Sequence, residues 1–140
     1  MRKASKIDTK NMILIILVFF VVIFSVIKLT QSYDINISIK NKILYINSDY
    51  GTNYNISDIN EIILLDNIPS MKKIEGKNSM KSYVGVFDAE NYGRARVYLE
   101  DKNSSNCIIL KINQEYVFIN QSSVSETKML YDEIANLVAK

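Results

Sequence analysis

The sequence lacks histidine and tryptophan, and its 140 residues include one cysteine, one proline and four scattered glycines. Without histidine, the chain cannot build a Ser-His-Asp triad, a histidine-ligated zinc site or an imidazole acid–base catalyst. A single cysteine, Cys107, rules out an intramolecular disulfide. Because Cys107 opens the apolar run that ends at Leu110, we expect a small buried side chain rather than a reactive thiol.

Basic residues are unevenly distributed along the chain. The first 30 residues contain one acid, Asp8, and five basic residues, which are Arg2, Lys3, Lys6, Lys10 and Lys28. The remaining 110 residues therefore hold 12 basic and 14 acidic residues, a net charge of −2. Such a domain has no positive field and no basic cluster to attract a polyanion, so we expect no nucleic-acid partner.

Residues 12–27 form an uncharged apolar run that is interrupted only by Ser25. As a helix, this run spans about 24 Å, slightly less than the roughly 30 Å of a bilayer's hydrocarbon core. Lys10 and Lys28 flank the run and can extend their aliphatic stems toward the interface. We therefore predict a basic tail over residues 1–10 and a transmembrane helix over 11–30.

Three interpretations of this segment compete, and a retained signal-anchor helix leads. A cleaved signal peptide is second, because only Thr30-Gln31-Ser32 resembles a cleavage site. A buried core helix is third, because a helix in a soluble protein would show a polar face. No cysteine follows the run directly, so we exclude a lipoprotein anchor.

The charge distribution predicts the orientation of the anchor. The four basic residues before the helix outnumber those just after it, which are Lys28, Lys40 and Lys42. By the positive-inside rule, the N-terminus is cytoplasmic and the domain lies outside the cell membrane. If the helix is instead cleaved, the domain is secreted.

From Tyr33 onward the apolar residues alternate with polar ones, which is typical of half-buried β-strands. We expect about seven strands in a domain spanning residues 33–140, with a polar loop over residues 47–55 and short turns at Asn41-Lys42 and Asn113-Gln114. The expected strands cover residues 35–39, 43–46, 61–65, 83–87, 93–99, 108–112 and 116–119, with room for a further short strand at 72–75.

The last 18 residues carry a different, helical spacing of apolar side chains at Leu130, Ile134, Leu137 and Val138. Ser123, followed three residues later by Glu126, fits a capping box at the start of such a helix. The fold class is therefore α+β and mainly β, with one C-terminal helix that caps two packed antiparallel sheets.

Several segments together resemble the bacterial pleckstrin-homology-like (PH-like) domains, in particular the group that follows membrane helices. The resemblance covers residues 33–138 and rests on Ile74-Glu-Gly76, Val84-Gly-Val-Phe87, Asn91-Tyr-Gly-Arg-Ala-Arg-Val-Tyr98 and residues 108–112 and 116–120. It implies two antiparallel sheets of about seven strands with a helix at one end, and a docking role for lipid headgroups, peptides or proteins. The first hairpin turn, with only Lys40 and Lys42, is too short and too weakly charged for phosphoinositide binding.

The most distinctive candidate binding residues are Tyr92, Arg94, Arg96 and Tyr98; the alternation places Arg94, Arg96 and Tyr98 on one strand face, and Tyr92 lies beside them in the preceding turn. Arginine beside aromatic residues is the composition favoured at protein interfaces. The competing interpretation is an exposed sheet face in which acidic residues on neighbouring strands neutralise the arginines.

The remaining polar motifs indicate ordinary surface. Acidic pairs occur at Asp88 and Glu90 and at Glu100 and Asp101, where solvated turns are expected. The stretch from Asn47 to Asp58 loosely resembles a calcium loop, but its glycine is one position early and the twelfth position is not glutamate. We therefore expect no metal, no cofactor and no catalytic residue.

These observations favour a membrane-anchored, non-catalytic binding module that docks a protein or peptide partner. A small-ligand or lipid-headgroup sensor, with a pocket near Arg94 and Arg96, is the alternative. A carboxylate-dependent hydrolase is a remote third hypothesis, which requires two acids to converge in a deep apolar cleft.

Overall fold

The computed structural model describes residues 9–30 and 34–139, and it divides into one unit up to Gln31 and a second from Ser32 onward. Most of the predicted basic tail, including Arg2, Lys3 and Lys6, lies outside the described residues, as do Gln31-Ser32 of the possible cleavage site and Tyr33.

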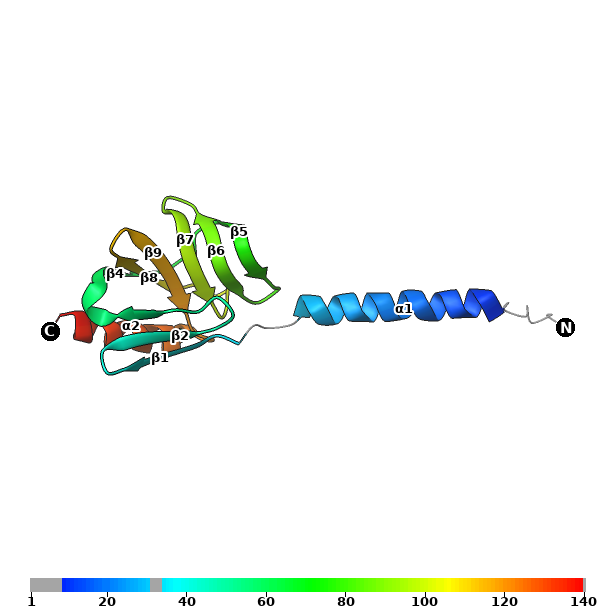
Figure 1. Ribbon diagram of the computed structural model, residues 1–140, viewed down its shortest axis with the longest axis horizontal. Helices are drawn as coiled ribbons and strands as arrows, with labels where there is room; N and C mark the ends of the chain where they lie inside the picture. Colours follow the sequence, from blue (N-terminus) through cyan, green and yellow to red (C-terminus); the bar gives the residue numbers. More distant parts are fainter. Residues whose placement is uncertain (1–8, 31–33, 140) are drawn as a thin grey trace. The chain divides into compact units, whose positions relative to one another are not determined.

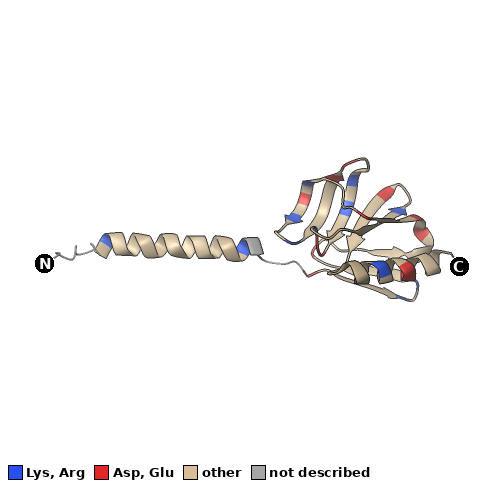
Figure 2. Cartoon of the chain, turned by 180° about the vertical axis from the view of Figure 1, so that it is seen from behind, with Lys and Arg blue, Asp and Glu red and all other residues tan. Residues whose placement is uncertain are grey.

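The first unit contains the helix α1 (Thr9–Thr30), which is long and apolar enough to cross a membrane, a criterion that a signal sequence also meets. Its charged side chains lie only near its two ends (Figure 2). The large apolar side chains from Met12 to Ile27 are 40–67% exposed, which does not fit a buried core helix. Ser25 donates its hydroxyl hydrogen to the Val21 carbonyl at 2.8 Å, so the one polar side chain in the run is satisfied within the helix.

The second unit has nine strands within residues 34–139, so the expected number of about seven is too low. The difference arises from β3, which lies in a stretch expected to be a loop, and from an eight-residue β5 where only a short strand had room. The strands are β1 (Asn36–Lys40), β2 (Ile43–Asn47), β3 (Asn53–Asn55), β4 (Ile59–Leu65), β5 (Met71–Asn78), β6 (Tyr83–Ala89), β7 (Gly93–Leu99), β8 (Cys107–Ile112) and β9 (Glu115–Asn120).

The strands form two sheets, a three-stranded sheet β1-β2-β3 and a six-stranded sheet β4-β8-β9-β7-β6-β5 (Figure 1). All pairs but one are antiparallel, as expected. The exception is β7, which pairs with β9 in parallel because the β8–β9 hairpin returns and inserts β9 between β8 and β7. The expectation of purely antiparallel sheets is therefore wrong at this pair.

The six-stranded sheet is apolar on both faces. The face that packs against the small sheet, which we call the outer face, contributes Tyr98, Leu110 and Ile119 to a core shared with the small sheet and the C-terminal helix. Its inner face contributes a second cluster that includes Phe87, Val97 and Phe118, all fully buried although no other sheet covers them. The two edge strands β4 and β5 are joined by residues 66–70 alone, so the sheet curls and encloses this second cluster.

Two features of β5 and β6 bend the sheet. Gly76 and Gly85 are register partners and have φ values of 121° and 131°, a region open mainly to glycine. A bulge between Lys73 and Glu75 adds one residue to β5 opposite β6. The two backbones approach closely where Gly76 lies opposite Gly85, so both positions require glycine.

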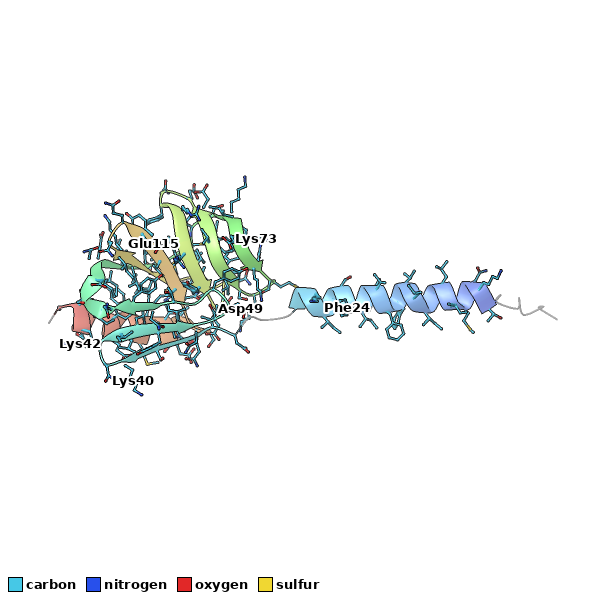
Figure 3. All side chains as sticks on the ribbon, in the orientation of Figure 1. Phe24, Lys40, Lys42, Asp49, Lys73 and Glu115 are labelled. Carbon is cyan, nitrogen blue, oxygen red and sulfur yellow. The ribbon has the colours of Figure 1, made fainter. Side chains whose placement is uncertain are left out.

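The predicted turns and the C-terminal helix are confirmed. Asn41 and Lys42 both adopt left-handed φ angles in a two-residue turn between β1 and β2, near the labelled Lys40 and Lys42 of Figure 3. The helix α2 (Val124–Val138) has Ser123 as its N-cap, which accepts a hydrogen bond from the Glu126 amide at 3.2 Å. The helix packs on β4, β8 and the short 3₁₀ helix η1 (Ile56–Asp58).

Candidate functional site

Arg94, Arg96 and Tyr98 lie on one face of β7, as the alternation predicts, but they differ sharply in burial. Tyr98 is fully buried, Arg96 is half-buried and Arg94 is exposed. The reason is that the small sheet and its loop cover only one end of this outer face. The Tyr98 hydroxyl donates a hydrogen bond to the Tyr50 carbonyl in that loop.

A salt bridge joins Arg96 to Glu115 on the neighbouring strand β9. The Arg96 Nε atom lies 2.8 Å from the Glu115 Oε1 atom, and both side chains are about 40% exposed. The hydrogen bond to Glu115 is the largest cause that raises the pKa of Arg96. Because water screens a pair this exposed, its main effect is to orient the two side chains.

Two tyrosines meet beside this salt bridge. Burial raises the pKa of the Tyr54 hydroxyl on β3 and of the Tyr98 hydroxyl on β7, and each hydroxyl also affects the pKa of the other. The Tyr54 oxygen is inaccessible to solvent and has no hydrogen-bond partner of good geometry among the described residues. The contact between β3 and β7 is therefore formed by aromatic side chains, and the hydroxyl groups of Tyr54 and Tyr98 are turned away from water.

Tyr92 lies apart from the other three predicted residues. Its ring packs edge-on against Tyr116 and Phe118, with centroids 5.2 and 5.3 Å away, at the margin of the inner cluster. The strand alternation does not extend to Tyr92, because Asn91 and Gly93 both have positive φ angles and the chain reverses there. The expected grouping of Tyr92 with the arginines therefore ends at the turn.

Beyond the salt bridge, a polar groove of about 520 Å³ opens between β3, η1, the start of β7 and the β8–β9 hairpin. We call it the Arg94 groove. Figure 3 labels Glu115, one of its lining residues. The groove is lined by Asn53, Tyr54, Asn55, Asp58, Arg94, Ile112, Asn113, Gln114 and Glu115.

The charges in the Arg94 groove are unequally compensated. Glu115 is paired with Arg96, and Asp58 accepts a hydrogen bond from the Asn55 side-chain amide at 3.2 Å. Arg94 is exposed and forms neither an ion pair nor a side-chain hydrogen bond within the described parts of the chain. The groove therefore presents one uncommitted guanidinium among amide side chains.

Of the groove residues, the sequence singled out only Arg94 as a candidate. The residues on β3 and η1 were missed because these elements fall in and just after a stretch expected to be a plain polar loop, and those of the β8–β9 hairpin were expected only as strand and turn. Their contribution arises from long-range packing of the small sheet on β7, for which the local pattern holds no signal. The clue in the sequence is Ile56, an apolar residue within a polar stretch; in the structure it is 2% exposed and anchors η1 in the core.

The two acidic pairs, Asp88 with Glu90 and Glu100 with Asp101, lie near opposite ends of β7. Asp88 lies opposite Arg94 in the β6–β7 register, whereas burial raises the pKa of Glu100 at the far end of β7. No group of three or more metal-ligating side chains occurs among residues 9–30 and 34–139. Cys107 is fully buried, and burial raises the pKa of its thiol to about 12, in line with the expected packing role.

No family model, curated protein or solved structure significantly matches the chain. The apolar helix, the fold and the Arg94 groove are therefore the features that bear on function. Together they describe a mainly β domain, joined in sequence to a helix suited to be an anchor or a signal sequence.

Proposed function

We propose that this protein is a single-pass membrane-anchored binding module without catalytic activity, whose domain docks a protein or peptide partner outside the cell. The apolar helix α1 with its flanking lysines supports the anchor. The excess of basic residues before the helix supports a cytoplasmic N-terminus. In this proposal α1 is retained, and the domain remains at the outer membrane face.

The observation that carries the proposal is the uncommitted guanidinium of Arg94 in an open groove. Arginine in the lining of a polar concave surface is typical of recognition sites, because its planar donors bind oxygen acceptors in a defined geometry. The surrounding amides offer both donors and acceptors, which suits a peptide backbone. Both groove acids are already engaged, so the groove provides recognition groups rather than the paired free carboxylates of a hydrolase.

Kinship with the bacterial PH-like domains is part of the proposal. Its support is a body of two sheets with a C-terminal helix packed against strands of one sheet. The parallel pairing of β7 with β9 counts against it, because the resemblance implies antiparallel sheets. The proposed docking role depends on the groove and does not require this kinship.

A small-ligand or lipid-headgroup sensor is the second candidate function. A volume of about 520 Å³ lies within the range of small-molecule sites, which gives this candidate its support. Its test is direct, because liposome or ligand binding that is unchanged when Arg94 and Arg96 are both replaced by alanine would dismiss the site.

Site-specific photocrosslinking in intact cells tests the docking proposal. A photoreactive residue is placed at the exposed Gln114 in the groove or, as the control, at Met129, which is 60% exposed on α2. We expect a discrete crosslinked product from position 114, none from 129, and loss of the product in Arg94→Ala. Equal crosslinking from both positions, or none from 114, would count against the proposal.

A further inference from the structure

The small sheet has an open edge at the Arg94 groove. Strand β3 pairs with β2 on one side and with no described strand on the other, and all three of its residues line the groove. An open strand edge offers backbone N–H and C=O groups to an extended segment, and such pairing is a common mode of peptide recognition. The groove thus combines a short free edge with a nearby cation.

The charge balance of the groove selects the kind of anion that fits. One guanidinium is uncommitted, while two carboxylates, from Asp58 and Glu115, remain in the lining. A phosphate or phosphomonoester with about two negative charges at neutral pH would be repelled by these carboxylates. A single carboxylate carries half that charge, is repelled less by the groove acids, and can accept two parallel hydrogen bonds from one arginine.

We infer that the Arg94 groove binds the free C-terminal end of a peptide, with the terminal carboxylate on Arg94 and the last residues along the edge of β3. The inference rests on the proposed docking function and specifies its ligand. Asn113 and Gln114 at the hairpin tip also line the groove and can hydrogen-bond the peptide backbone. A peptide amide or a mid-chain segment lacks the charge that Arg94 recognises.

The test compares a peptide acid with its amide on the full-length protein in detergent micelles. The probe is acetyl-Val-Thr-Val-Thr, which favours extended structure, prepared with either a free or an amidated C-terminus. We expect the free acid to bind about threefold more tightly by calorimetry, because the charge-assisted pair forms at an exposed arginine and is partly screened by water. Amide NMR signals of residues 53–55 should shift on addition of the acid.

Three variants assign the effect to the proposed atoms. Arg94→Gln should abolish the preference for the acid, and Arg94→Lys should retain only part of it, because lysine keeps the charge but loses the planar fork. Lys73→Gln removes an exposed cation outside the groove and should leave the preference unchanged. Figure 3 labels Lys73 on β5. Circular dichroism establishes that each variant is folded.

The inference would be overturned by equal affinity for the acid and the amide, by no binding of either peptide, or by a preference that persists in Arg94→Gln. Displacement of the peptide acid by inorganic phosphate more effectively than by acetate would also overturn it. If crosslinking from Gln114 remains dependent on Arg94 while these peptide tests fail, the docking function stands and only its ligand is wrong.

Discussion

The Tyr98 hydroxyl donates a hydrogen bond of 2.6 Å to the Tyr50 backbone carbonyl, joining the middle of the six-stranded sheet to the loop between β2 and β3. A salt bridge between Lys77 on β5 and Asp49 in the same loop forms a second link. Together these contacts hold the small sheet over the outer face of β7. They thereby fix how much of that face remains open beside Arg94.

Removal of the Tyr98 hydroxyl should weaken this attachment. We expect Tyr98→Phe to lower the free energy of unfolding by roughly 1–2 kcal/mol, because the hydrogen bond is lost while the ring stays packed. Urea denaturation followed by circular dichroism measures the effect. Tyr45→Phe is the matched control, since the Tyr45 side chain makes no hydrogen bond within the described residues, and it should change stability little. Equal effects of both changes would argue against the attachment.

Substitution of Gly85, which lies opposite Gly76 on β5, should strongly destabilise the protein. A Cβ atom at Gly85 would overlap the Glu75 carbonyl oxygen and lie 2.7 Å from the Gly76 Cα, in addition to the cost of φ +131°. We expect Gly85→Ala to destabilise the protein by roughly 3 kcal/mol or more, measured by urea denaturation. At Gly93 a Cβ meets nothing within 4 Å, so Gly93→Ala should cost only about 1 kcal/mol for its positive φ. Similar losses at both positions would contradict the close approach of β5 and β6.

The stability that the start of α2 contributes should decrease at acidic pH. Hydrogen bonds from Ser122 and Ser123 lower the pKa of the Glu126 carboxyl below its ordinary value of 4.5. Because the pKa of Glu126 is lower in the folded protein than in the unfolded chain, its ionised carboxylate stabilises the fold. This stabilisation is fully present above pH 4.5 and is lost as the pH falls through the lower pKa of the folded state.

Denaturation between pH 3 and 6 tests this effect. We expect Glu126→Gln to remove part of the loss of stability at the acid end of this range. Glu133→Gln, an exposed change on the same helix, should preserve the wild-type profile. A Glu126→Gln profile parallel to that of the wild type would dismiss the effect.

Cysteine labelling tests the side of the membrane on which the domain lies. Native Cys107 is fully buried with a raised pKa, so we expect it to resist maleimide unless the protein is denatured. Ser105→Cys creates an exposed thiol in the turn before β8, which a membrane-impermeant maleimide should label in intact cells. Lys6→Cys in the basic tail should react only after lysis. Protection of position 105 in intact cells would reverse the proposed orientation.

Local patterns in the sequence predict most of the individual elements. Ile37 and Ile39 alternate with polar residues and form β1, and the Ser123–Glu126 spacing predicts the start of α2. These predictions succeed because period-two burial, hairpin turns and helix caps each depend on residues a few positions apart. β3 was missed for the converse reason, since a three-residue polar strand is defined by its partner β2 and not by its own pattern.

Patterns along the chain are enough to predict the apolar helix, the class of the domain and the placement of Arg94, Arg96 and Tyr98 on one strand face. The parallel pairing of β9 with β7, the burial of Tyr98 and the role of Arg94 as the uncommitted cation of a groove follow from packing between distant segments. The two sets of features differ because the interactions that produce them act over different distances along the chain. Hydrophobic periodicity and capping act within a few residues, whereas burial and charge compensation on β7 depend on the small sheet and on Glu115, which lie far away in sequence.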